Sequence, residues 1–374
     1  MFSDLKVGIL GGGQLGTMII RSAVDFGLNV SVLDKHPNSP AARYTSSFYC
    51  GDTMDYETVL SFGSSLDILT IEKESVNTKA LHALQKMGVK IYPSPGTIEI
   101  IQNKLLQKQF LESNHIPVVP CIPVNGRDDL RQNINKLPGC LKKCTMGYDG
   151  KGVMIIKGRE DIESAFNEPS ILEELVDIKS EISVIVSRNE HGDISCYDPV
   201  MMVFNKEQFI LDYQVCPADI PEEIANEARD LAISIAAALK LEGILAVEMF
   251  LTHDNVLLVN ELAPRPHNSG HHTIEACATS QYEQLIRVML GMPMGDTQLR
   301  QKAVMMNILM PKTESEESMN AALREMLSLQ NVHLHWYGKE QSKAGRKVGH
   351  VTIIESEIEN ALSKVVTIRN IKHN

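Results

Sequence analysis

The chain has 374 residues, of which 43% are hydrophobic and 22% charged, and its formal net charge of −11 at pH 7 is compatible with a soluble globular protein of two or three domains. The negative charge argues against non-specific nucleic-acid binding, and no apolar run is long enough to cross a membrane. The seven scattered cysteines complete no zinc site and residues 1–6 show no signal-peptide pattern, so we expect a cytoplasmic protein with reduced thiols.

The N-terminal residues predict an α/β domain with a glycine-rich turn. An apolar strand at 5–10 leads into Gly-Gly-Gly-Gln-Leu-Gly at 11–16, then a helix, then a second strand that ends at Asp34. A Gly-x-Gly-x-x-Gly pattern followed by an acid about 20 residues later is typical of dinucleotide-binding domains, so an NAD-dependent oxidoreductase is one alternative function. The turn itself is less specific, because its amides and the helix dipole suit any phosphate group.

A further strand completes this domain. Residues 66–71 are strand-like and end in the charged run Glu72-Lys73-Glu74, a pattern that is often only a solvated strand end. The segment Pro-Ser-Pro-Gly at 93–96 then predicts a domain boundary near residue 95.

The next segment combines a helix with a glycine-rich loop. Apolar residues at helical spacing predict one helix over 97–113, with Lys104 and Lys108 on its polar side, where solvation is their simplest role. A strand that carries Lys142 enters the loop 145–152, which contains three glycines and a lysine. The loop lacks the spacing of a Walker motif, but such a loop can close over phosphates and exclude water. A plain hairpin loop is the alternative.

Two β-rich runs, at 245–252 and 256–261, flank a polar break and predict a hairpin. A two-residue turn at 254–255 would place Glu248 directly opposite Glu261. Like charges in that position destabilise a sheet, so the two carboxylates must share either a proton or a cation. A surface hairpin with exposed acids is the simpler interpretation of either residue alone.

The residues that follow strengthen the interpretation as a metal–phosphate site. Asn260 adds an amide oxygen, and hard oxygen ligands of this kind suit Mg²⁺ bound together with substrate phosphates. Prolines stiffen the loop 262–270, which holds Arg265, His267 and Asn268 beside the proposed metal. Arginine is always charged and forms paired hydrogen bonds with oxyanions.

The C-terminal part carries a strand at 332–337 followed by a basic loop. Alternation places His333 and His335 on one face of the strand, but a metal site would need a third ligand. Lys339 and the segment 344–347, Ala-Gly-Arg-Lys, form a local basic cluster whose glycines allow close approach to an anion.

Three segments resemble the 5-(carboxyamino)imidazole ribonucleotide synthase family, the ATP-grasp enzymes of purine biosynthesis. They are Val-Glu-Met-Phe at 247–250, Val-Asn-Glu-Leu-Ala-Pro-Arg-Pro-His-Asn-Ser-Gly-His at 259–271, and His-Leu-His-Trp-Tyr-Gly-Lys at 333–339 with Gly-Arg-Lys-Val-Gly-His at 345–350. The similarity runs along nearly the whole chain. It implies an ATP-grasp fold of mixed α/β and α+β class.

The resemblance also implies a division into four parts. These are a parallel-sheet substrate domain (1–95), a helix with a lid subdomain (96–176), a metal and nucleotide subdomain (177–300), and a C-terminal β piece that binds the substrate phosphate and packs on the first domain (301–374). The implied reaction is ATP-dependent carboxylation of 5-aminoimidazole ribonucleotide by bicarbonate through carboxyphosphate. Members of the family are typically homodimers.

Individual roles follow from the same resemblance. Glu248 and Glu261 are the expected Mg²⁺ ligands, and Arg265, His267 and Lys347 are expected to act in catalysis. The residues expected to bind ATP are Lys104, Lys142, Gly147, Tyr148, Asp149, Gly150, Lys151, Gly152, Glu173, Glu174, Leu175, Val176, Glu181, Asn260 and Glu261. The residues expected to bind the ribonucleotide are Gln14, Leu15, Glu74, Tyr148, Asn268, Lys339, Arg346 and Lys347.

The chain departs from the family pattern at Lys73, where an aromatic residue is usual, at Ser75, where Asn is usual, and at Met146, where Gly is frequent. Glu74 is therefore the preferred substrate contact in its run. Besides the NAD-dependent oxidoreductase, another ATP-grasp ligase, such as a formate-dependent glycinamide ribonucleotide transformylase, shares most motifs. The segment at 333–337 favours the imidazole enzyme, and a non-catalytic binding protein is the least favoured alternative.

Overall fold

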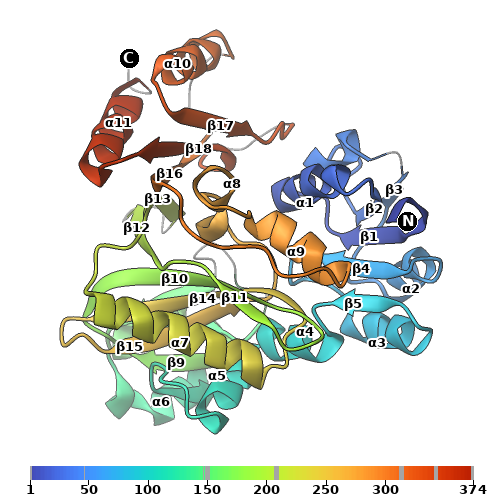
Figure 1. Cartoon of the computed structure of the whole chain (residues 1–374). Helices are drawn as coiled ribbons and strands as arrows, with labels where there is room; N and C mark the ends of the chain where they lie inside the picture. Colours follow the sequence, from blue (N-terminus) through green and yellow to red (C-terminus); the bar gives the residue numbers. More distant parts are fainter. Residues whose placement is uncertain are drawn as a thin grey trace.

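The computed structural model describes residues 2–45, 47–145, 147, 152–205, 210–310, 316–340 and 344–371, which form three sheets with flanking helices (Figure 1). Within these residues no helix is both long and apolar enough to span a bilayer. The division of the chain at residues 95, 176 and 300 stays a prediction.

The N-terminal sheet is parallel, with strand order β3-β2-β1-β4-β5. Its strands and helices are β1 (Lys6–Leu10), α1 (Gln14–Asp25), β2 (Asn29–Asp34), β3 (Ser47–Cys50), α2 (Tyr56–Gly63), β4 (Ile68–Ile71), α3 (Thr78–Lys86) and β5 (Lys90–Tyr92). The chain passes from one side of β1 to the other between β3 and β4. Binding crevices form at such points, outside the carboxyl ends of the strands.

The single helix expected over 97–113 is wrong, because the chain forms α4 (Pro95–Gln102) and α5 (Lys104–Ser113). Asn103 between them is extended, with φ −120° and ψ 112°, and its side chain accepts hydrogen bonds from the amides of Leu105 and Leu106. Asparagine competes with helical hydrogen bonding in this way and caps a new helix. Lys104 consequently lies in the first turn of α5.

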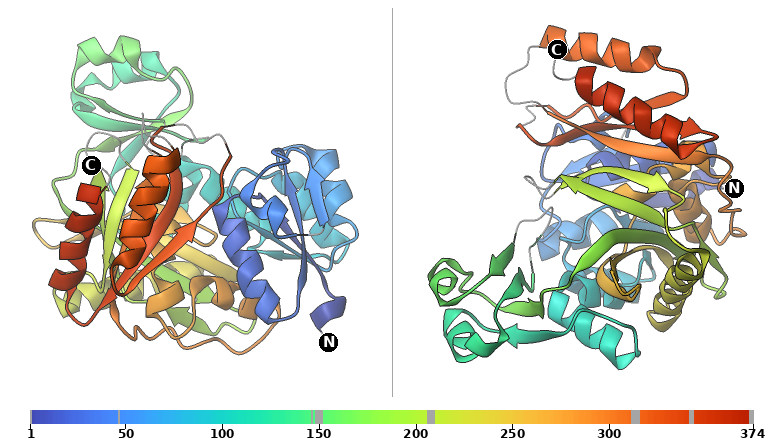
Figure 2. Two further views of the ribbon diagram at one scale, coloured as in Figure 1. Left: turned by 90° about the horizontal axis from the view of Figure 1, so that it is seen from above. Right: turned by 90° about the vertical axis from the view of Figure 1, so that its left-hand side faces the viewer.

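The second sheet is antiparallel and projects from the body of the molecule (Figure 2). Its strands, in the spatial order β6-β9-β7-β8, are β6 (Cys121–Val124), β7 (Gly139–Lys143), β8 (Val153–Ile156) and β9 (Ser170–Glu174). The short helix α6 (Arg127–Gln132) packs on it through the buried Leu130. Lys142 on β7 and Glu173 on β9 lie near the end of this sheet that faces the third sheet.

The third sheet contains strands from residues 178–263 and from the C-terminal residues 302–355, and the pairing of β16 with β13 connects the two groups of strands. Its strands are β10 (Ile178–Arg188), β11 (Ile194–Cys196), β12 (Val200–Asn205), β13 (Ile210–Cys216), β14 (Gly243–Thr252), β15 (Leu257–Ala263), β16 (Lys302–Leu309), β17 (Val332–Trp336) and β18 (Lys347–Glu355). Its helices are α7 (Glu222–Ala238), α8 (Thr273–Ala276), α9 (Gln281–Met289), α10 (Glu316–Ser328) and α11 (Ile358–Ile371). The C-terminal strands thus extend the central sheet, and they also contact the first domain through Arg21 and His335 at 3.4 Å.

Candidate active site

Glu248 on β14 and Glu261 on β15 are directly paired, which confirms the predicted facing carboxylates. The predicted two-residue turn is wrong. The amide of Thr252 donates to the carbonyl of Val256 at 3.0 Å, so the loop has three residues, and Asn255 adopts a left-handed φ of 60°. Asparagine tolerates this conformation, which three-residue hairpin loops commonly require.

A bulge at Asn260 explains why Glu248 and Glu261 are still paired although the loop has three residues instead of two. The register shifts between Glu248 and Met249, so β15 has one extra residue there. The bulge offsets the extra loop residue and restores the pairing of Glu248 with Glu261.

A third carboxylate, Glu181, lies near the paired Glu248 and Glu261 and acts on Glu248 through its charge. Burial, and then the charges of Glu261 and Glu181, raise the pKa of Glu248 to about 8. Burial also raises the pKa of Glu181, on the neighbouring strand β10, to about 7. Ionised carboxylates in such surroundings are costly unless a cation neutralises them. The site therefore fits a divalent cation.

Within the described part of the chain, no three His, Cys, Asp or Glu side chains converge closely enough to hold a metal ion. Glu248 and Glu261 would need further oxygen ligands. This donor set is typical of Mg²⁺ sites completed by nucleotide phosphates and water.

Two lysines from other elements reach the hairpin. Lys104 on α5 pairs with Glu261, and Lys142 on β7 donates to the side-chain oxygen of Asn260 at 2.7 Å. Lys142 also lies 2.6 Å from an oxygen of Glu173. The structure thus brings together the lysines and hairpin residues expected at the triphosphate.

The glycine-rich loop is described only at its ends, and four of the residues expected to bind ATP, Tyr148, Asp149, Gly150 and Lys151, lie outside the described residues. Gly152 has φ of +85°, and a Cβ built on it would lie 3.4 Å from the Cα of Gly147. The two ends of the loop therefore lie side by side, at the end of β7 that carries Lys142.

Residues 173–176, which are expected to bind ATP, divide into a buried and an exposed part. The side chain of Glu173 is only 2% exposed, whereas Glu174 and Leu175 are exposed and Val176 is half-buried. The Glu173 carboxylate is therefore buried inside the protein. The predicted solvation of Lys108 is wrong, because this residue is only 2% exposed. Its spacing of four residues from Lys104, on the same helical face, was the available signal.

Arg265 connects the hairpin to the first domain. Its guanidinium lies 2.7 Å from Glu74, and although burial opposes the charge, the nearby Glu74 raises the pKa of Arg265. The Nε of Arg265 is buried and has no hydrogen-bond partner among the described residues. Arg265 therefore retains a donor for an oxyanion, and the role of Glu74 as a substrate contact stays a prediction.

His267 is held by its neighbours in a neutral form. Burial, and then Arg265 and Lys347, keep the pKa of His267 well below its usual value. Its Nδ1 accepts a hydrogen bond from the amide of Ser269 at 3.3 Å, and Nε2 lies 3.5 Å from Glu248. Gln281 accepts from the backbone amide of His267 at 2.9 Å and donates to its carbonyl at 2.8 Å. The Nε2 hydrogen is thus directed toward the carboxylate pair.

The glycine-rich turn binds a carboxylate of the protein itself. The amides of Gly13 and Gly16 donate to Glu72 at 2.9 and 3.1 Å, and the amide of Gly12 donates to Asp34 at 2.9 Å. A Cβ at Gly13 would lie 2.8 Å from the Glu72 oxygens, so glycine is needed for this approach. Glu72 thus takes the position that a dinucleotide's pyrophosphate would need. This role of Glu72 was not predicted, although Glu72 directly follows β4, the strand that pairs with β1.

This arrangement predicts that the chain does not bind NADH. Titration of NADH with the protein is expected to leave nucleotide fluorescence unchanged, because Glu72 and Asp34 occupy the amides of the turn. An ATP analogue titrated under the same conditions is the positive control. Saturable enhancement of NADH fluorescence would contradict the prediction.

The basic cluster lies at the junction of β17 and β18. Lys339 donates to the carbonyl of Lys347 at 2.7 Å, and Arg346 is exposed. The charge of Lys347 acts on both Glu248 and His267, so this lysine lies beside the hairpin site. Asn268 is held by Asn307 through reciprocal amide contacts of 3.1 and 2.9 Å. Gln14 and the buried Leu15 begin α1, beside the Glu72 turn.

His335 does not act as half of a metal pair with the exposed His333. Its ring stacks on His350 with centroids 4.5 Å apart, and its Nε2 lies 2.6 Å from Glu275. This contact links β17 to α8.

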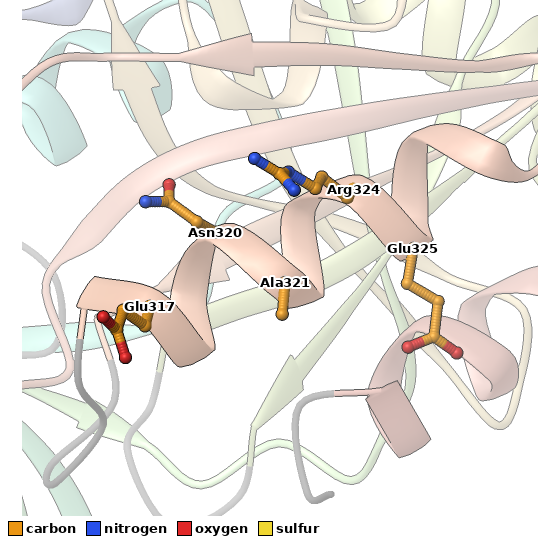
Figure 3. Close-up of a pocket in the computed structure, with 5 residues that line it drawn as sticks. All are labelled: Glu317, Asn320, Ala321, Arg324 and Glu325. Carbon is orange, nitrogen blue, oxygen red and sulfur yellow. The ribbon is translucent and has the colours of Figure 1, made fainter.

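A hollow of about 630 Å³ over α10 is separate from these residues (Figure 3). Its lining residues are Glu317, Asn320, Ala321, Arg324 and Glu325. All of them come from one helix, so side chains from different elements do not converge there as they do at the hairpin.

Comparison with known proteins shows the family of the chain. Family models match the chain at 5–102 (ribonucleotide synthetase preATP-grasp domain), 109–282 (ATP-grasp domain) and 303–364 (phosphoribosylaminoimidazole carboxylase C-terminal domain). The N5-carboxyaminoimidazole ribonucleotide synthase of Bacillus subtilis is 38% identical over 95% of this chain and 93% of its own length. The chain belongs to the N5-carboxyaminoimidazole ribonucleotide synthase family.

Solved structures of this family are also similar. The Thermotoga maritima synthetase is 39% identical with a TM-score of 0.89, and each chain is covered to 98%. An Aspergillus clavatus synthase, described in complex with ADP and 5-aminoimidazole ribonucleotide, is 32% identical with a TM-score of 0.90, and both chains are covered completely. The predicted family, the ATP-grasp fold and the assignment as an ATP-dependent ligase are confirmed, and the oxidoreductase alternative is not supported.

Proposed function

We propose that this synthase carboxylates the exocyclic amine of 5-aminoimidazole ribonucleotide, using ATP and bicarbonate, in purine biosynthesis. The products are N5-carboxyaminoimidazole ribonucleotide, ADP and phosphate. One observation supports the proposal: the loop with Arg265 and His267 contacts Glu248 of the carboxylate pair on one side and Glu74, the proposed ribonucleotide contact, on the other. A single loop can therefore act on a group passed from ATP to the ribonucleotide.

The nucleotide is proposed to bind between the lid sheet and the hairpin. Lys104 and Lys142 would contact the phosphates, the backbone of 173–176 the adenine edge, and Glu181 the ribose hydroxyls. Glu248 and Glu261, with Asn260 beside them, would hold Mg²⁺, which when bound supplies charge neutralisation at the phosphates. Closure of the loop 147–152 would exclude water from a hydrolysable intermediate.

Bicarbonate is proposed to bind at Arg265, His267 and Lys347. An oxygen of bicarbonate attacks the γ-phosphorus and ADP leaves, which gives carboxyphosphate. The amine of the ribonucleotide then forms a bond to the carboxyl carbon while the C–O bond to phosphate breaks, and the released phosphate takes up the amine proton. The neutral His267 would donate from Nε2 to a carboxyl oxygen, since its Nδ1 already accepts from Ser269.

The ribonucleotide is proposed to lie across the junction of the first and third sheets. Gln14, Leu15 and Glu74 would contact it from the first domain, and Asn268 from the hairpin loop. Lys339, Arg346 and Lys347 would bind its 5′-phosphate, and Tyr148 of the glycine-rich loop would cover it. We further propose a cytoplasmic homodimer, which light scattering coupled to gel filtration would test.

The substrate assignment is tested by ADP release. The enzyme is expected to release ADP with bicarbonate and 5-aminoimidazole ribonucleotide together, and to be inactive with formate and glycinamide ribonucleotide. Product mass should show one added carboxyl group. Turnover with formate instead would favour the transformylase alternative.

Replacing Arg346 by Ala is expected to raise the KM for the ribonucleotide about tenfold and to leave the KM for ATP nearly unchanged. A charge-assisted hydrogen bond contributes about 1.5 kcal/mol at an exposed position, which corresponds to about one power of ten. Arg324→Ala on α10 is the control for general loss of positive charge. An equal loss for both substrates would mean that the basic loop is structural.

A further inference from the structure

A carboxylate buried between two lysines lies beneath the proposed phosphate site. Glu173 on β9 has one oxygen 2.8 Å from Lys108 on α5 and the other 2.6 Å from Lys142 on β7. The side chains of Glu173, Lys108 and Lys142 are 2%, 3% and 11% exposed. The group therefore carries one net positive charge in a desolvated position.

Stability does not explain the charge on Lys108. Buried ion pairs stabilise a protein no better than apolar side chains of similar volume, because desolvation offsets the attraction. Lys108 lies 2.8 Å from one oxygen of Glu173. Its other contact is a long one, 3.5 Å, to the carbonyl of Val259. The charge of Lys108 is therefore directed mainly at Glu173.

The position of this charge relates it to the nucleotide. Lys104 and Lys108 lie four residues apart on one face of α5, and Lys104 pairs with Glu261 of the hairpin. Lys142 is held at the same hairpin by Asn260. If Glu173 had Lys142 as its only partner, that pair would be neutral and Lys142 would attract a triphosphate less strongly.

We propose that Lys108 is a positioning residue for ATP, which engages one oxygen of Glu173 and so leaves Lys142 available to the phosphates. The proposal rests on the phosphate-binding role proposed above for Lys142. Glu173 directs the Lys142 ammonium group toward the hairpin, and Lys108 preserves the positive charge there.

The test compares Lys108→Met with Lys143→Met in the full-length enzyme. Lys143 also lies on β7, but it pairs with the exposed Glu168 at 2.9 Å. Lys108→Met is expected to weaken binding of ADP and of a non-hydrolysable ATP analogue roughly tenfold, as for removal of a unit charge about 10 Å away at an effective dielectric constant of 20. Lys143→Met should have no effect, and Lys108→Arg should retain binding.

Calorimetry of nucleotide binding and steady-state kinetics give the readouts. For Lys108→Met the KM for ATP should rise roughly tenfold, while kcat and the KM for the ribonucleotide stay within about twofold, a separation that a general structural defect would not produce. Unchanged nucleotide affinity in Lys108→Met would overturn the proposal.

Lys142→Met separates this inference from the proposed function. If Lys142→Met weakens ATP binding and Lys108→Met does not, only the role of Lys108 is wrong. If Lys142→Met has no effect, the phosphate role of Lys142 is wrong as well. Lys108→Gln is a second neutral variant, and unfolding of both neutral variants would show that the charge serves the fold and would overturn the proposal.

Discussion

Glu261→Gln is expected to lower kcat by about two to three orders of magnitude. The substitution removes a proposed Mg²⁺ ligand and also the carboxylate partner of Lys104. Metal ions contribute several kcal/mol of charge stabilisation in such reactions, and about 3–4 kcal/mol corresponds to this loss. Bicarbonate-dependent ADP release, measured over a range of Mg²⁺ concentrations, gives the result. Glu248→Gln should behave similarly.

The control lies in the same hairpin. Asp254 is exposed in the loop between β14 and β15, so Asp254→Asn removes a negative charge without touching the pair. It should leave kcat and the Mg²⁺ requirement unchanged. Full turnover of Glu261→Gln at the ordinary Mg²⁺ requirement would refute the metal role of the pair.

Glu173→Gln is expected to lower the free energy of unfolding by about 3–5 kcal/mol, because it leaves two buried lysines without a counter-charge. The contribution depends on pH. Burial opposes ionisation, but Lys142 and Lys108 lower the pKa of Glu173 below the ordinary value of 4.5. Stability from this group is therefore present above pH 4.5 and is lost as the pH falls through the lowered pKa.

Glu168→Gln is the matched control for this prediction. Glu168 pairs with Lys143, which follows Lys142 on β7. The Glu168 side chain is 60% exposed, and exposed ion pairs contribute about 0–1 kcal/mol. Urea unfolding followed by circular dichroism at pH 7 compares the two variants. Equal, small losses of unfolding free energy in the two variants would show that the Lys108–Glu173–Lys142 group does not stabilise the fold.

Local patterns predicted much of the fold and part of the site. Alternation and turn residues predicted β14 and β15, and the pairing of Glu248 with Glu261 is confirmed although the turn is wrong. The prediction succeeded because the bulge at Asn260 compensates for the third loop residue. The helix break at Asn103 was missed, since the apolar spacing continues through it while the side chain caps a new helix.

The ligand of the glycine-rich turn could not be predicted from the local sequence. Its pattern indicates an anion-binding turn, and the structure has one, but the anion is the Glu72 carboxylate. Glu72 reaches the turn because β4, the strand before it, lies beside β1 in the sheet. That strand order is a property of the whole domain.

By itself, the sequence determined the family, the secondary structure of the hairpin and the residue types that can serve phosphate and metal chemistry. Only the tertiary structure decided which of these charges meet: Lys108 and Lys142 at Glu173, Lys104 at Glu261, and Arg265 at Glu74. Secondary-structure periods specify the face of an element on which a side chain lies. Its partner depends on how separate helices and sheets pack, and burial then sets the strength of each contact.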